Sequence, residues 1–100
     1  MQIAGTEVFG AVLSLLKTGF EDEAIDIANS TEYGLVGGIF TTNIDVGRRI
    51  HAGQIFINDW YTGGVKTPFS GYGKSGYGRE NGREALWNYV QTKNIAYRTR

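Results

Sequence analysis

The stretch GGIFTTNIDVGRRIHAGQIFIN, from Gly37 to Asn58, decides the fold of this chain. Its first residues, Gly37–Thr41, and its last residues, Gln54–Asn58, are short apolar runs that predict two strands. A helix is predicted between them, because Thr42 or Asn43 can cap its start, arginines lie near its end and a glycine can stop it. Two strands joined by a helix predict a parallel pair with a right-handed crossover.

The residues before this stretch predict one more strand and one more helix. Ala11–Leu16 is a continuous apolar run, which is typical of a strand covered on both faces. The segment TGFEDEAIDIANSTEYG then predicts a helix, because three acids lie in its first turn and Gly34 can close it. The apolar positions at helical spacing are Phe20, Ala24, Ile27 and Thr31. Together with the central stretch, this order predicts a parallel βαβαβ unit.

The residues after Asn58 predict a different kind of structure. Residues 59–82 are rich in glycine, contain the only proline and have no sustained period, so they predict a long loop. Glu84–Val90 predicts a short helix, and Ile95–Tyr97 predicts a C-terminal edge strand guarded by basic residues. The expected fold class is therefore α/β, with a βαβαβ unit followed by a Gly-rich loop, a short helix and a C-terminal strand.

Composition limits the classes of function. One hundred residues with 41% hydrophobic content suit a single domain over residues 1–100. Ten basic residues balance ten acidic ones, and no apolar run could span a bilayer, so we expect a cytoplasmic protein without nucleic-acid or membrane partners. The chain has no cysteine and one histidine, which excludes disulfides, a thiol nucleophile and a cysteine or histidine metal cluster. We expect no metal site and no catalytic residue in this chain.

The stretch PFSGYGKSGYGRENG, Pro68–Gly82, resembles two phosphate-binding motifs but satisfies neither. A P-loop needs a glycine five residues before the glycine of its GK[ST] end, and that position here is Pro68, which has no amide hydrogen. The dinucleotide motif G-x-G-x-x-G must join the first strand and helix of a βαβ unit and precede an acid by about 20 residues. Here it follows a loop, and that count reaches Ala96. The glycines are better explained by close packing or positive φ.

Six spaced segments resemble the C-terminal part of the NAD(P)-dependent aldehyde dehydrogenase superfamily. The resemblance covers Glu7 to Ile95. The segments are EVFG, FEDEAIDIAN, YGL, FINDW, PFSGYGKSGYGRENG and YVQTKNI, in this order. The resemblance implies part of the family's catalytic domain, with residues 91–100 as an oligomerisation strand. It also implies that the glycine stretch is a connecting loop near the substrate entrance.

The resemblance also implies roles for five residues. Glu7 and Phe9 match the E-x-F-G motif, in which the carboxylate binds the nicotinamide ribose and the ring packs beside the nicotinamide. A carboxylate can accept two hydroxyl donors and a flat ring can hold a planar heterocycle. Phe69 matches a residue that lines the aldehyde tunnel, and Trp60 and Tyr61 stand in the variable loop that shapes it. Taken alone, Glu7 would be a surface acid and Phe9 a core residue, while Trp60 and Tyr61 could equally serve packing or tunnel lining.

What the chain lacks relative to that family limits its activity. The family's nucleophilic cysteine, general-base glutamate and dinucleotide-binding domain lie upstream of the segment that matches Glu7. We therefore expect a C-terminal fragment or truncated member that uses NAD or NADP only within the full-length family, binds no cofactor alone and is not catalytic alone. The alternative is a stand-alone self-associating structural or interaction module. A third reading, a small nucleotide binder that uses the glycine loop, is the weakest.

We also expect association with other chains. A cut sheet would leave an open edge and an uncovered apolar face, which favour pairing with another copy or with full-length aldehyde dehydrogenase subunits. The expected product is a homo-oligomer held by the sheet edge or by the C-terminal strand. The residues expected on that face are Val12, Leu15, Ile39, Phe56 and Ile57.

Overall fold

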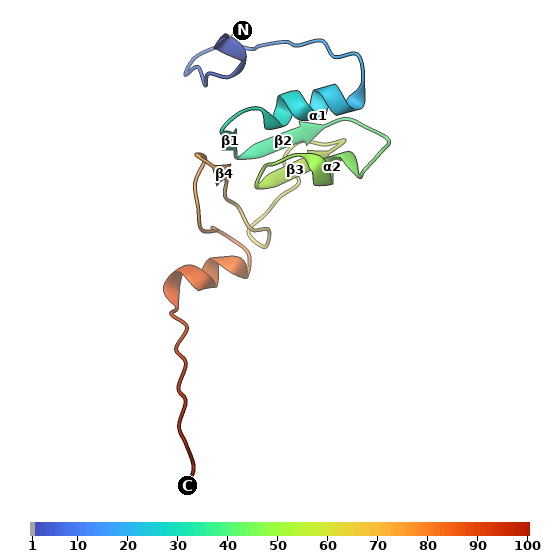
Figure 1. The fold of residues 1–100 in the computed structure, drawn as a ribbon. Coiled ribbons are helices and arrows are strands. Elements are labelled where there is room, and N and C mark those ends of the chain that lie inside the picture. Colours follow the sequence, from blue (N-terminus) through green and yellow to red (C-terminus); the bar gives the residue numbers. More distant parts are fainter. Residues whose placement is uncertain (1) are drawn as a thin grey trace.

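A two-stranded parallel sheet forms the centre of the computed structural model, which describes residues 2–100 (Figure 1). Strand β2 (Val36–Ile39) pairs in parallel with β3 (Gln54–Ile57), so that the first residues of the two strands lie opposite each other. The connection contains helix α2 (Val46–Arg49), a single turn. The parallel strand–helix–strand arrangement predicted for this stretch is confirmed.

Helix α1 (Glu21–Asn29) precedes the sheet and confirms the first predicted helix. The predicted apolar face is incomplete, however, because the buried residue of α1 is Ile25, at 4% exposure, while Phe20 before the helix is 67% exposed. The helix also ends earlier than expected. Ser30 follows it with a backbone N–H donated to the carbonyl of Ile27, and Gly34 belongs to a strand instead.

The core consists of three buried side chains, one from each of α1, α2 and β3. They are Ile25, Val46 and Phe56. Gly47 allows α2 to approach the sheet closely, since a Cβ at this position would lie 2.9 Å from Cδ1 of Ile57. Gly47 thus leaves room for the side chains of Ile55 and Ile57 against α2, although glycine has a low helix propensity.

The Gly-rich loop is tied to the rest of the chain at several points. Strand β1 (Tyr33–Gly34) pairs antiparallel with β4 (Tyr72–Gly73). Within the loop, Phe69 and Glu80 exchange two backbone hydrogen bonds of 2.7 and 2.8 Å. Gly53 also passes so close to the loop that a Cβ would lie 1.5 Å from the carbonyl oxygen of Ser70. These ties give the long connection a defined path.

The predicted strand at Ala11–Leu16 is wrong for the described structure. These residues are extended but form no strand, and all six are exposed. The physical reason is that no strand of residues 2–100 pairs with them, so no sheet ladder satisfies their backbone groups and no layer covers their side chains. The βαβαβ prediction therefore holds only for β2, α2 and β3, preceded by α1.

The C-terminal part leaves the body of the molecule, as Figure 1 shows. The predicted helix is present as the 3-10 helix η2 (Glu84–Tyr89), and another 3-10 turn, η1 (Gln2–Ala4), lies near the N-terminus. Residues 90–100 form no strand in the described chain, so the predicted C-terminal strand at Ile95–Tyr97 is wrong there, because no second strand supplies its hydrogen bonds. The pairing of residues 91–100 with another copy stays a prediction.

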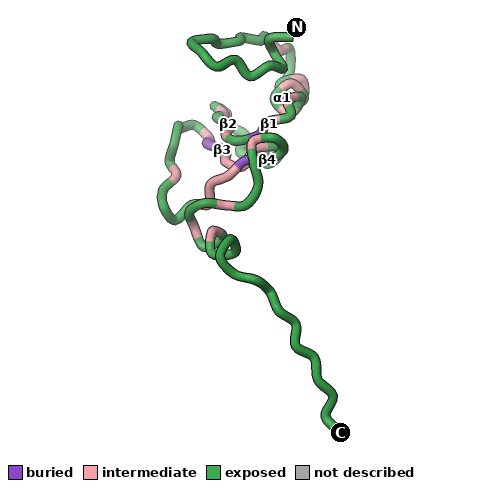
Figure 2. The backbone as a smooth tube through the Cα atoms, turned by 90° about the vertical axis from the view of Figure 1, so that its left-hand side faces the viewer, coloured by how far each residue is buried: buried purple, intermediate pink, exposed green. Residues whose placement is uncertain are grey.

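The chain is elongated as a result. Its radius of gyration is 18.4 Å, whereas a compact domain of this length has about 13 Å. Figure 2 shows that the N-terminal segment and the C-terminal tail are almost wholly exposed, while the buried residues lie around the central sheet. Phe56, at 6% exposure, therefore does not belong to the expected uncovered face, whereas Val12 and Leu15 are exposed.

Candidate functional site

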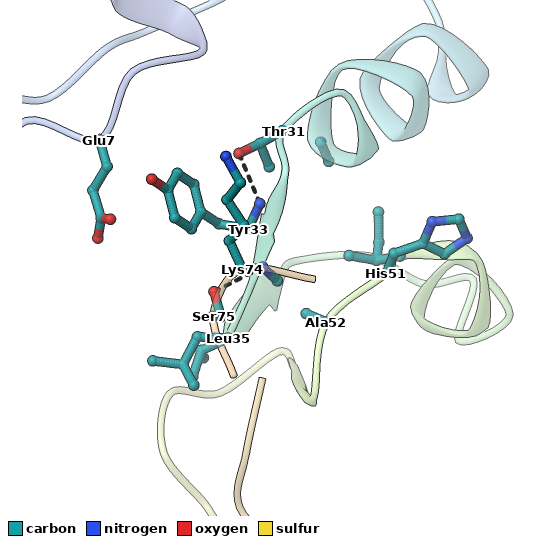
Figure 3. Close-up of a pocket in the computed structure, with 12 residues that line it drawn as sticks. Glu7, Thr31, Tyr33, Leu35, His51, Ala52, Lys74 and Ser75 are labelled. Atoms are coloured by element: carbon teal, nitrogen blue, oxygen red, sulfur yellow. Dashed lines mark hydrogen bonds between the residues drawn. The ribbon is translucent and has the colours of Figure 1, made fainter. Parts of the chain in front are cut away.

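A cavity of about 520 Å³ lies between the N-terminal segment and the body of the molecule (Figure 3). Its wall combines Glu7 of the N-terminal segment, Tyr33 of β1, His51 of the turn before β3 and Lys74 of the Gly-rich loop. In Figure 3 the ring of Tyr33 points toward the segment that carries Glu7. Residues far apart in the sequence thus meet around one mixed polar and apolar space.

The two predicted cofactor residues lie in different surroundings. Glu7 is exposed and lines this cavity, and no hydrogen bond or ion pair engages its carboxylate within residues 2–100. Phe9 is 94% exposed and is not part of the cavity wall. A carboxylate can accept hydrogen bonds from ribose hydroxyls and a flat ring can pack on a heterocycle, but the role of the two residues at a nicotinamide site stays a prediction. The structure does not bring them together in one enclosed pocket.

The polar groups of the glycine motif hold the loop to the body of the molecule. The backbone N–H of Lys74 donates to the carbonyl of Glu32 at 2.9 Å, and the Ser75 hydroxyl accepts the N–H of Gly34 at 3.0 Å. No helix starts at Ser75 among the described residues, so the positive helix end that a P-loop presents to phosphate is missing there. These contacts support a packing role for the motif.

Lys74 also forms an exposed ion pair. Its Nζ lies 2.7 Å from Oε2 of Glu32, and both side chains are more than half exposed. The hydrogen bond to Glu32, with the attraction of the same carboxylate, raises the pKa of Lys74 above its ordinary value of 10.5. The ammonium of Lys74 thus forms a second contact between the loop and Glu32, the residue that precedes β1.

Two of the predicted tunnel residues pack against the core. The rings of Trp60 and Tyr61 lie 5.9 and 6.1 Å from the ring of Phe56, both in tilted arrangements. Trp60 also covers Gly38 of β2, where a Cβ would lie 2.7 Å from its Cζ3. Trp60 is 64% and Tyr61 69% exposed, so each ring has a packed face and a free face.

Tyr61 and Phe69 meet at a second, smaller cavity of about 120 Å³. Gln54 from the start of β3 and Asn81 from the end of the Gly-rich loop complete its wall with two glycines. The Nε2 of Gln54 donates to the carbonyl of Pro68 at 3.2 Å. Trp60 does not line this cavity, so the structure brings together two of the three predicted tunnel residues.

Sequence reasoning missed Gln54 and Asn81. Gln54 is the polar first residue of the otherwise apolar run QIFI, and that break in the run is a signal that could have singled it out. Asn81 precedes Gly82, and such a pair marks a turn in which asparagine accepts positive φ. Neither signal reveals that the two residues face one cavity, because this depends on the path of the loop between them.

Two further findings concern the described residues as a whole. Over residues 2–100, no helix combines the length and the apolar character that a membrane crossing requires. In the same range, no group of three or more histidine, cysteine, aspartate or glutamate side chains could hold a metal ion.

The chain is similar to solved aldehyde dehydrogenases over nearly its whole length. An NAD-dependent aldehyde dehydrogenase from Sinorhizobium meliloti is 44% identical, with 93% of this chain covered and a TM-score of 0.84. A betaine aldehyde dehydrogenase from Staphylococcus aureus and an indole-3-acetaldehyde dehydrogenase from P. syringae, solved with NAD+ and IAA, are each 38% identical with TM-scores of 0.86. They cover 95% and 93% of this chain, respectively.

These matches occupy a small part of the solved proteins. The chain spans about a fifth of each, with shares of 19%, 20% and 20% for the three structures. The profile described as "Aldehyde dehydrogenase family" matches residues 1–95. Family match, sequence identity and fold agree, and the chain belongs to the aldehyde dehydrogenase family.

Proposed function

We propose that this chain forms the C-terminal part of an aldehyde dehydrogenase catalytic domain and does not oxidise aldehydes alone. The observation that carries the proposal is the match of residues 1–95 to the family, at 38–44% identity, within about a fifth of the solved relatives. In this proposal Glu7 and Phe9 supply one edge of the nicotinamide site, and Trp60, Tyr61 and Phe69 shape the path of the aldehyde.

The residue types of the chain support the proposal that it contributes to the site but does not oxidise aldehydes alone. Covalent oxidation of an aldehyde needs a thiolate to attack the carbonyl, and the sequence has no cysteine. Bound NAD(P) would supply the hydride acceptor. Glu7 can accept hydrogen bonds from a ribose and Phe9 can pack on one face of a heterocycle, but these contacts cover only one side of such a ligand. Such limited contact offsets little of the freedom that a ligand loses on binding, so the chain alone should hold NAD(P) weakly.

A chimera tests the proposal. We would replace the matching segment of the Sinorhizobium meliloti enzyme with this chain and follow NADH absorbance with a panel of aldehydes. The expected results are turnover by the chimera and none by the isolated chain. Sustained turnover by the purified chain, or a folded chimera without activity, would contradict the proposal.

The role of Glu7 is tested in the same chimera. Glu7→Gln should raise the KM for NAD about tenfold, because a neutral amide is a weaker acceptor for ribose hydroxyls than a carboxylate. Glu84→Gln is the matched control, since Glu84 is exposed and no hydrogen bond engages its side chain within residues 2–100. If the two substitutions change the KM for NAD equally, Glu7 does not contact the cofactor.

A second candidate function is self-association, favoured by the exposed surface. The chain exposes 8834 Å², whereas a compact monomer of 11.0 kDa exposes about 5,600 Å². Much of the excess lies on extended ends that carry apolar side chains such as Leu13, Leu15 and Tyr97, each more than 80% exposed. A second copy, or a full-length relative, could cover these surfaces.

Sedimentation equilibrium at low micromolar concentration tests this second function. The expected result is a dimer or larger assembly. A monomer of 11.0 kDa would contradict it. An oligomer that survives deletion of residues 93–100 would show that the sheet edge, and not the tail, holds the copies together.

A further inference from the structure

The end of the Gly-rich loop contains a pair of residues with a chemistry of its own. Asn81 is followed by Gly82, and no other asparagine of the sequence precedes a glycine. Asparagine is thermally labile, because the backbone nitrogen of the next residue can attack its side-chain carbonyl. A glycine in the next position favours this attack, since it has no side chain to hinder the approach. Asn81 is exposed, so water reaches its amide.

Backbone hydrogen bonds hold this pair in place from both sides. The N–H of Glu80 donates to the carbonyl of Phe69 at 2.8 Å, and the N–H of Gly82 donates to the carbonyl of Val65 at 2.9 Å. Asn81, between them, has a φ of 58°. The nitrogen that would attack is therefore engaged. To close a cyclic imide it must lose its proton and turn toward Cγ of Asn81, which requires the bond to Val65 to break.

We propose that Asn81 is a modification site, protected while the Gly-rich loop is closed and deamidated when the bond from Gly82 to Val65 opens. In the first step the Gly82 nitrogen gives its proton to water and forms a bond to Cγ of Asn81. The bond from Cγ to the side-chain nitrogen breaks, and this nitrogen takes up a proton and leaves as ammonia. Water then adds to either carbonyl of the imide, which leaves aspartate or isoaspartate. The inference goes beyond the proposed function and does not depend on it.

The modification would change the loop permanently. Isoaspartate adds a methylene group to the backbone next to Gly82, so the hydrogen bonds to Phe69 and Val65 could no longer form together in their present positions. Either product also places a new carboxylate near that of Glu84, whose Oε2 lies 2.9 Å from the position of a Cβ at Gly82. Asn81 lines the small cavity that Phe69 also borders. The change therefore occurs where the proposed function places the path of the aldehyde.

Deamidation and hydrogen exchange of the full 100-residue chain test the proposal together. Peptide mass spectrometry follows the conversion of Asn81 in neutral buffer and in urea, and NMR measures how far the amide exchange of Gly82 is slowed in buffer. Both reactions need the same N–H to be free. Deamidation should therefore be slower in buffer than in urea by about tenfold or more, and this factor should match the slowing of exchange within about threefold.

Variants separate the chemistry of the pair from the opening of the loop. Gly82→Ala, compared with the wild type in urea, should slow deamidation severalfold, because the methyl group hinders the attack whether or not the chain folds. Gly53→Ala should accelerate deamidation in neutral buffer, since its Cβ would overlap the carbonyl oxygen of Ser70 and displace the loop. Gly64→Ala is the matched control, because its Cβ would meet nothing within 4 Å. Asn94, in the exposed tail and without a following glycine, is the internal reference and should stay unmodified.

Two outcomes would overturn the inference. The first is an Asn81 that converts no faster than Asn94 in urea. The second is equal deamidation in buffer and in urea while the amide of Gly82 is protected from exchange. If the isolated chain lacks dispersed amide signals, the same rates are measured in the folded chimera, where deamidation as fast as in urea contradicts the protection. None of these measurements uses catalysis, so their failure is distinct from a failure of the proposed function.

Discussion

Two apolar runs of this chain behave differently. Gln54–Ile57 forms strand β3 of the central sheet and contains the buried Phe56. Ala11–Leu16 is at least as apolar, yet it has no partner strand, and Leu13 and Leu15 are 82% and 86% exposed. The difference teaches that burial in this chain depends on a partner strand and a covering helix, not on hydrophobicity alone.

The largest expected effect sharpens this comparison directly. Phe56→Ala should cost about 3–5 kcal/mol of unfolding free energy, because it removes a buried ring that contacts Trp60 and Tyr61. A core of three buried side chains can hardly tolerate this loss, so the dispersed amide NMR signals should collapse. Leu15→Ala should change the unfolding free energy by less than about 0.5 kcal/mol. A comparable loss from Leu15→Ala would show that the run is buried in the assembled protein and would break the comparison.

The next effect concerns the contact between the start of β3 and the Gly-rich loop. Gly53→Ala should destabilise the chain by about 1–3 kcal/mol, because its Cβ would overlap the carbonyl oxygen of Ser70 and the backbone would have to move. Gly64→Ala is the control, since its Cβ would meet nothing within 4 Å. Urea unfolding of both variants checks this. Equal midpoints would mean that the loop does not pack against β3 as described.

A smaller effect is expected where β3 ends. Asn58 continues the ladder with its side chain: Oδ1 accepts the N–H of Thr41 at 2.8 Å and Nδ2 donates to the carbonyl of Thr41 at 2.7 Å. Asn58→Ala should cost about 1–2 kcal/mol, since it removes both bonds and places alanine at a φ of 57°. Asn94→Ala in the exposed tail should be neutral. Equal melting temperatures of the two variants would show that the two hydrogen bonds between Asn58 and Thr41 contribute nothing measurable to stability.

The smallest effect concerns the ion pair between the loop and β1. Glu32 raises the pKa of Lys74, so the pair contributes fully below the lysine's ordinary pKa of 10.5 and is lost as the pH rises through the raised value. The difference in urea midpoint between the wild type and Lys74→Met should therefore shrink when the pH is raised from about 9 to above 10.5. Lys93→Met, in the exposed tail, should show no such change. A difference that is constant with pH would mean that the pair contributes nothing measurable.

Local sequence patterns were sufficient to predict a strand or helix where the elements it packs against lie nearby in the chain. The apolar runs Gly37–Thr41 and Gln54–Asn58, with a helix between them, predicted a parallel pair, which the structure has as β2 and β3. The same reasoning failed for Ala11–Leu16, because a strand exists only when a second strand supplies its hydrogen bonds. Ile25 was missed because the helical positions were counted from Phe20, which stays exposed. In the candidate site, the aromatic residues were visible in the sequence, but the hydrogen bond from Gln54 to the carbonyl of Pro68 forms only after the loop folds back.

The register of the central sheet also sets an order of events for a growing chain. Val36 pairs with Gln54 and Ile39 with Ile57, so each partner lies eighteen residues after the other. Closing so short a loop costs little chain entropy, and structures with local contacts form quickly. Strand β2, helix α2 and strand β3 can therefore assemble soon after residue 58 is synthesised. The run Ala11–Leu16 pairs with no strand of residues 2–100, so it stays exposed after this unit has formed.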